Sequence, residues 1–300
     1  MNAQPGAGPR TRTWLSDFLR GPYAPWLTHG SLAIITLAYF ALLLLVPFWI
    51  AFVPAVILSH RIGTLLHEYM HGIPFRRYSH NHTVVTLFDG FMLMFGTLEM
   101  FRVSHLQHHR WLNTDDDQAS EKAAKVGRNK VLDIVAGMEV VQYLIAFFPA
   151  AMGKQKNVRH GRIAVAALLS VVTILAWVAV GRGDVVWKMI AVTLFTMLVP
   201  VSLRAAIEHY SYEGDANFAN EYRVWVPLFN LNRHIHHHED PAVPWYLLQW
   251  RTGQPLPRWF YVSHWLHVYI KRDFVLMRPM RAHDRAKARA DGVSARSLRS

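Results

Sequence analysis

Two long apolar stretches, each broken once near its middle, constrain the fold of this chain more than any other feature. The first covers residues 27–66, with Pro47 and Pro54 at its centre, and its few strongly polar side chains are His29, His60 and Arg61. Its 40 residues suit two membrane-spanning helices of about 20 residues each,. Because helices satisfy their own backbone polar groups inside a bilayer, this stretch predicts a helical hairpin.

A second apolar stretch covers residues 163–203. It is uncharged before the short polar turn at 181–184 and apolar after that turn apart from Lys188. Basic residues flank both of its ends: Lys154, Lys156, Arg159, Arg162 and Arg204. Under the positive-inside rule, both ends of this second hairpin are expected in the cytoplasm, together with both chain termini.

The composition agrees with an all-α polytopic membrane protein: 52% of the 300 residues are hydrophobic and only 17% are charged,. We expect a cytoplasmic segment at 1–26, one membrane domain at 27–277, and a basic, disordered tail at 278–300. The net charge of +12 is attributed to contact with anionic lipid headgroups. Nucleic acid is therefore not an expected partner.

Two further segments are apolar but carry carboxylates. Residues 83–101 contain Asp89 and Glu99, and residues 131–152 contain Asp133, Glu139 and Gln142. Carboxylates inside a membrane are costly, so we expect both segments to be interfacial helices. If 131–152 crossed the membrane, the histidines that follow would lie on the opposite side from those that precede it.

Eight histidines form three clusters, each beside an apolar stretch. The first reads H-x-x-x-H and the other two read H-x-x-H-H, comprising His67, His71, His105, His108, His109, His234, His237 and His238. Residues four apart on a helix share one face, and imidazole suits iron, zinc, copper and nickel. These clusters predict a site for two metals, each with about four nitrogen ligands, in a cytoplasmic helical cap.

The surroundings of the clusters are also distinctive. The third cluster is followed by a Pro-x-x-Pro-Trp-Tyr segment, residues 241–246. With these three boxes and two apolar hairpins in order, residues 30–250 resemble the integral-membrane fatty acid desaturase superfamily. That superfamily includes hydroxylases, ketolases and alkane-oxygenating enzymes.

The resemblance implies two iron ions per chain, O₂ as the oxidant, and the eight box histidines as ligands. Many members carry a further histidine after the last membrane helix, and His209 occupies that place, either as a ninth ligand or as a partner held by Glu208. The other acids expected to bond to ligand rings are Glu68, Glu239 and Asp240. The acidic run 115–117 is expected to be either a solvated loop or a set of acceptors for box histidines, with a cation site as the alternative. The spacing of His236 leaves its role open.

The expected activity is O₂-dependent lipid oxidation. We expect a fatty acyl or lipid desaturase, with lipid or hydrocarbon hydroxylation or ketolation as the alternative on the same scaffold. The chain has no cysteine, which excludes iron–sulfur centres. An external ferredoxin, cytochrome or similar donor with its reductase is therefore expected, at a bacterial inner membrane.

One motif supports a different chemistry. Residues 67–71 read His-Glu-Tyr-Met-His, which also satisfies the H-E-x-x-H pattern of zinc metalloproteases. In that interpretation His67 and His71 bind zinc, Glu68 is the general base, and an acid such as Asp89 is the third ligand. This alternative assigns no role to the second and third boxes.

Overall fold

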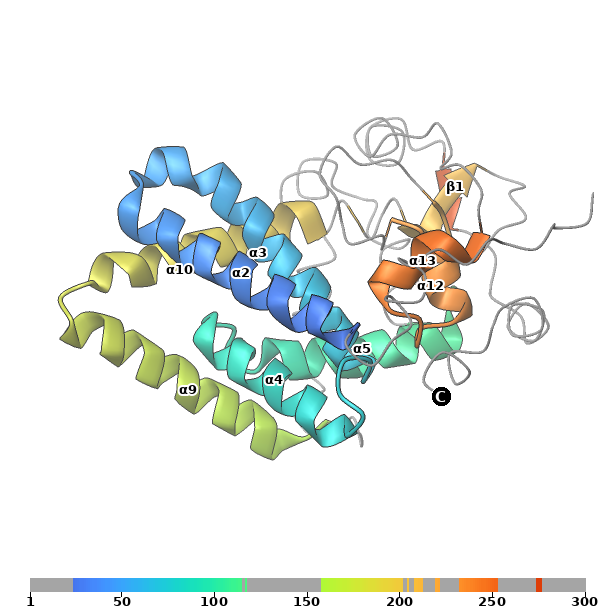
Figure 1. Cartoon of the computed structure of the whole chain (residues 1–300), viewed down its shortest axis with the longest axis horizontal. Coiled ribbons are helices and arrows are strands. Elements are labelled where there is room, and N and C mark those ends of the chain that lie inside the picture. The colour runs from blue at the N-terminus through green and yellow to red at the C-terminus, as the bar shows by residue number, and fades with distance from the viewer. Residues whose placement is uncertain are drawn as a thin grey trace, which may run out of the picture.

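The computed structural model describes residues 24–114, 117, 158–201, 204, 208–212, 219–221, 232–252 and 274–276. The predictions for residues 1–23, 131–152 and 278–300 lie outside these ranges, and the domain boundaries stay predictions. The described part is almost entirely helical (Figure 1). Two helical hairpins point away from a cap that contains the third histidine box.

The first apolar stretch forms the predicted hairpin, α2 (Pro25–Leu45) and α3 (Phe48–Met70). The turn falls at Pro47, whose fixed φ suits the entry to a helix. Tyr39 and Leu43 of α2 are completely buried, as are Ala51 and Ala55 of α3. The hairpin is therefore held by a close contact between the two helices near the turn.

The second apolar stretch forms the other predicted hairpin. It comprises α9 (His160–Ala179), α10 (Gly183–Thr196) and a π-helical turn η1 (Met197–Val201). All four helices are long and apolar enough to cross a membrane, which confirms the predicted number of spans. Their outward side chains include Leu168 and Leu175, at least 60% exposed, as lipid contact requires.

Lys188, the charged exception in the second stretch, joins the ends of the two hairpins. Its ammonium donates to the carboxylate of Asp184 at 2.7 Å and to the carbonyl of Leu43 at 3.1 Å. Arg182 also pairs with Asp184 at 2.9 Å. Cations near a helix C-terminus satisfy its unpaired carbonyls, so the turn of one hairpin caps the end of α2.

Residues 83–101, predicted as one interfacial helix, instead belong to two helices: α4 (Tyr78–Phe91) and α5 (Thr97–Trp111). The break contains three residues with positive φ, Leu93, Phe95 and Gly96. The buried Asp89 carboxylate accepts hydrogen bonds from the backbone N–H groups of Gly96 at 2.7 Å and Leu98 at 2.9 Å. It therefore caps the start of α5 from the preceding helix and directs α5 toward the cap.

We expect Asp89→Ala to lower the free energy of unfolding by about 1–2 kcal/mol, the usual cost of losing a helix cap. The reason is that the N–H groups of Gly96 and Leu98 would lose their acceptor. Thermal unfolding in detergent measures this loss. Thr83→Ala is the control, because its exposed hydroxyl bonds only to the Ser79 carbonyl of α4; an equal loss in that variant would contradict the capping role.

The cap contains two short helices, α12 (His234–Glu239) and α13 (Trp245–Thr252). It also contains an antiparallel pair of three-residue strands, β1 (Tyr210–Tyr212) and β2 (Phe274–Leu276). This small sheet was not predicted, because three residues are too few for an alternating pattern to be recognised. Its pairing joins two segments of chain that are more than 60 residues apart in sequence.

Candidate metal centre

Nine histidines lie at one end of the hairpins and divide into two groups. The first group contains His67, His71, His105, His109 and His237, and the second contains His108, His209, His234 and His238. Each H-x-x-H-H box is therefore shared: its first and last rings join one group and its fourth residue joins the other. On a helix the last two residues of such a box point about 100° apart, which explains the division.

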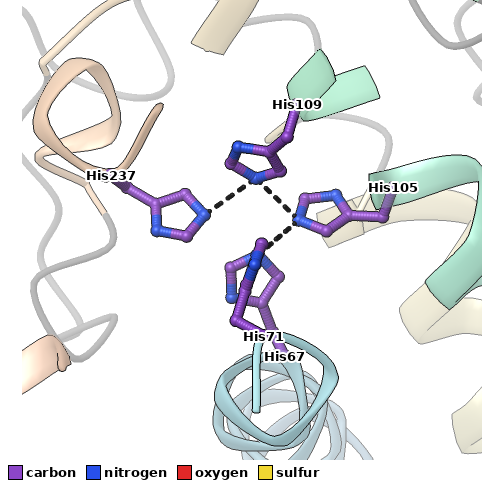
Figure 2. Close-up of side chains that lie close together, drawn as sticks. All are labelled: His67, His71, His105, His109 and His237. Atoms are coloured by element: carbon purple, nitrogen blue, oxygen red, sulfur yellow. Dashed lines mark hydrogen bonds between the residues drawn. The ribbon is translucent and has the colours of Figure 1, made fainter. Parts of the chain in front are cut away.

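The first group is drawn in Figure 2, where five rings from three helices point toward a common centre. His67 lies in the last turn of α3 and His71 caps that helix. The Nε2 atom of His105 lies 2.7 Å from that of His67 and 3.1 Å from that of His71. The Nε2 atom of His109 lies 3.0 Å from those of His105 and His237.

The second group is built around His209, on the segment between η1 and β1. Its Nε2 atom lies 3.1 Å from that of His108 and 3.1 Å from that of His234. The Nε2 atoms of His234 and His238 are 2.8 Å apart. The expectation that His209 takes part in the site thus agrees with its position, and its ligation stays a proposal.

The nitrogen spacing fits metal ions better than hydrogen bonds. A nitrogen of a neutral imidazole either donates or accepts a hydrogen bond. The Nε2 atoms of His67, His71 and His105 all lie within 3.3 Å of one another, so these three atoms cannot all be hydrogen-bonded to each other. Two nitrogens bound to one metal at about 2.1 Å in perpendicular directions lie about 3.0 Å apart. The observed spacings of 2.7–3.3 Å within the groups match this value.

The protonation of the rings also suits ligation. Burial, followed by the proximity of the other histidines, lowers the pKa of His105, His109 and His237 well below the usual value. Burial alone lowers the pKa of His71 to about 3. Neutral imidazole is the form that binds metals, so these residues are in the correct state at neutral pH.

Carboxylates orient part of the second group. The Asp117 carboxylate accepts from His108 Nδ1 at 2.8 Å and from the Asn113 backbone N–H at 2.9 Å. This confirms that an acid of the 115–117 run bonds to a box histidine. The Glu208 carboxylate lies 3.4 Å from His234 Nε2 and forms an ion pair with Arg204. Glu208 therefore contacts a ring of the second group.

His236 belongs to neither group. Its Nδ1 lies 2.8 Å from Glu239 and its Nε2 lies 3.4 Å from Glu221. Burial opposes protonation of this ring, but the hydrogen bonds to the two carboxylates outweigh it and raise its pKa. A residue that favours its protonated form is a poor metal ligand, so His236 instead stabilises the cap.

The acids at the end of the third box differ in their contacts. Glu239 was predicted to bond to a ligand ring but bonds to His236. Glu239 is the last residue of α12 and lies three residues after His236, one turn along the same helix face, so its carboxylate meets that ring,. Asp240 accepts from the Ala242 backbone N–H at 3.3 Å, and its predicted bond to a ligand ring stays a prediction. Glu221 was missed because it lies 13 residues before the third box, with no motif to connect them.

Glu68 joins three segments of the chain. Its Oε1 accepts from the Trp245 backbone N–H at 2.8 Å, and its Oε2 lies 3.5 Å from the hydroxyl of Thr28. The Trp245 indole N–H also donates to Thr28 at 3.2 Å. The acid of the first box therefore holds the Pro-Trp segment after the third box against α2.

These contacts argue against the zinc protease alternative. Asp89, its proposed third ligand, uses both carboxylate oxygens to cap α5. Glu68, its proposed base, bonds to Trp245 and Thr28. The two histidines of the motif share their group with three rings from the other boxes, so the residues that the structure describes do not form the protease arrangement.

An apolar cavity of about 160 Å³ leads to the histidines from the membrane helices. It is lined by α3, α5, α10 and η1, and its inner end is formed by His67 and His105 of the first group and His108, His209 and His234 of the second. The hydroxyls of Thr64 and Thr196 bond to carbonyls of their own helices, at 2.9 Å and 2.7 Å. These two residues therefore have no free donor for water.

Four apolar helices, three histidine boxes and a shared cavity are typical of a membrane protein whose histidines could hold metal ions. The family model for fatty acid desaturases matches residues 43–269. The chain belongs to the fatty acid desaturase family, which confirms the resemblance seen in the sequence. Searches of curated proteins and of solved structures gave no significant match, so the assignment depends on the family model and the site.

Proposed function

We propose that this chain is a desaturase that introduces a carbon–carbon double bond into a fatty acyl lipid, using two iron ions held by the nine histidines. The observation that carries the proposal is that one apolar cavity ends at histidines of both groups. A methylene segment that fills this cavity reaches both metal positions at once. Membership of the family supports a lipid substrate and an oxidative reaction.

Iron at these positions would supply redox chemistry, which zinc lacks. The overall reaction is R–CH₂–CH₂–R′ + O₂ + 2 e⁻ + 2 H⁺ giving R–CH=CH–R′ + 2 H₂O, so two electrons must come from outside the chain. The protein positions the acyl chain of the substrate and excludes water from the reacting carbons. Leu66 and Met70 of α3 and Phe101 of α5 are among the apolar residues that line this cavity.

Mass spectrometry of lipids from a host with and without the expressed protein tests this function. Desaturation gives acyl chains that are lighter by two hydrogens, whereas the hydroxylase or ketolase alternative gives chains that carry an added oxygen. A His238→Ala variant, which removes a ring of the second group, is the control for effects of expression alone. Unchanged lipids in both cultures would overturn the proposal.

We also propose that the histidine groups face the cytoplasm of a bacterial inner membrane. The support is the set of basic residues at this end of the hairpins, Arg159, Arg162 and Arg204, together with the positive-inside rule. A cytoplasmic face gives access to an external electron donor and its reductase. Contact with nucleic acid forms no part of the proposal.

Replacing Glu68 by Gln separates the desaturase from a zinc protease. We expect lipid oxidation to fall by about 10-fold and to remain measurable, because an amide oxygen can still accept from the Trp245 N–H. In a protease this change would stop catalysis while leaving the metal bound. The assay is lipid product and metal content in the same preparation, and complete loss of product with full metal content would contradict the positioning role.

A further inference from the structure

Gly63 is the exposed residue among those of α3 that line the cavity. It lines the cavity together with Ile62 and Thr64, but those two neighbours are buried whereas Gly63 is exposed. A Cβ atom added at Gly63 would meet no atom within 4 Å. The absent side chain therefore leaves an open space between the cavity and the surface of the hairpins.

This opening lies at a depth where the surface meets lipid. Gly63 is seven residues from the end of α3, or about 10 Å along a helix with a rise of 1.5 Å per residue. The helix is one of the four candidate spans. On α10, which packs against α3, Leu194 and Phe195 are 57% and 40% exposed beside the cavity residue Thr193.

The facing helix also changes geometry at this level. Residues 197–201 form the π-helical turn η1, and Met197 and Val201 within it line the cavity. Such turns are frequent at functional sites. Glycine in a helix interior costs about 1 kcal/mol relative to alanine, so Gly63 lowers the stability of α3 at the place where the wall is open.

We infer that the substrate chain enters the cavity sideways from the bilayer, through the opening at Gly63 between α3 and α10. The inference rests on the proposed function and specifies its substrate: an acyl chain of a lipid resident in the membrane, rather than one presented from water. Gly63 is then a specificity-determining residue, because any side chain there narrows the entrance.

The first test is Gly63→Leu, assayed with substrate lipid reconstituted in vesicles. We expect turnover to fall about 10-fold or more, since even one extra methylene in an apolar pocket discriminates by that amount, while metal content stays unchanged. Gly30→Leu is the matched control, because Gly30 is a glycine of α2 with equally open space that does not line the cavity. Turnover of Gly63→Leu equal to that of Gly30→Leu would overturn the inference.

A second test needs no catalytic activity. The chain has no cysteine, so Gly63→Cys carries a single thiol that can be labelled in vesicles with an alkyl maleimide dissolved in the bilayer or with a charged maleimide in water. We expect labelling by the alkyl reagent alone, and slower labelling when stearic acid is added. Leu37→Cys is the control: Leu37 is 71% exposed on α2 and does not line the cavity, so stearic acid should not protect it.

The labelling separates the two proposals. Protection of Gly63→Cys without any lipid product would retain the lateral entrance and contradict the desaturase function. Labelling by the charged reagent, or no protection by stearic acid, would contradict the lateral entrance even if the enzyme is active.

Discussion

His105→Ala will abolish lipid oxidation and lower the iron content of the purified protein from two ions to about one per chain. The Nε2 atom of His105 lies within 3.1 Å of those of His67, His71 and His109, so its loss opens the first group at its centre. Even an outer partner of a ligand is worth 10-fold to 100-fold in affinity or activity. Loss of a ligand at a redox site should therefore exceed about 100-fold.

His236→Ala is the matched control, because His236 lies in the third box but bonds to Glu221 and Glu239. We expect it to retain both irons and most of its activity. Elemental analysis and product formation, measured on the same preparations, decide the outcome. One zinc and no iron in the unaltered protein would refute the iron site, and full activity of His105→Ala would remove that residue from the ligand set.

Purified protein supplied with NAD(P)H alone will give no product, and activity will appear when a ferredoxin, cytochrome or similar donor is added with its reductase. The physical reason is that the chain has no cysteine for an iron–sulfur centre. In the proposed function its box histidines bind the two iron ions and are not ligands of a haem. We therefore expect the electrons to come from contact with another protein. The net charge of +12 favours an acidic donor.

The dependence on salt provides the measurement that is specific to this donor. Attraction between a basic protein and an acidic donor is screened as ionic strength rises, so the rate with donor should fall between low and physiological salt. An artificial uncharged reductant, whose rate should not follow salt, is the control. Turnover on NAD(P)H alone would show that the chain contains a cofactor site of its own.

The parts predicted from sequence alone are those that depend on local pattern. The length of the apolar stretches determines two hairpins, and the turns at Pro47 and Gly181 follow from residues that interrupt a helix. The H-x-x-x-H and H-x-x-H-H spacings place rings on helix faces because of the 3.6-residue period. Eight of the nine histidines in the two groups were identified in this way, and His209 was added by resemblance.

Tertiary structure decided which rings meet. The spacing within a box indicates that His108 and His109 point in different directions. It does not show that His108 meets His209, His234 and His238, because that depends on how distant segments of the chain are placed. The same holds for Glu68, which contacts Trp245 at a separation of 177 residues, and for Asp89, which caps the next helix. Such contacts depend on the relative placement of helices, which is decided by side-chain packing between segments far apart in sequence. The cavity and its opening at Gly63 arise in the same way, from the space that α3, α5 and α10 leave between them.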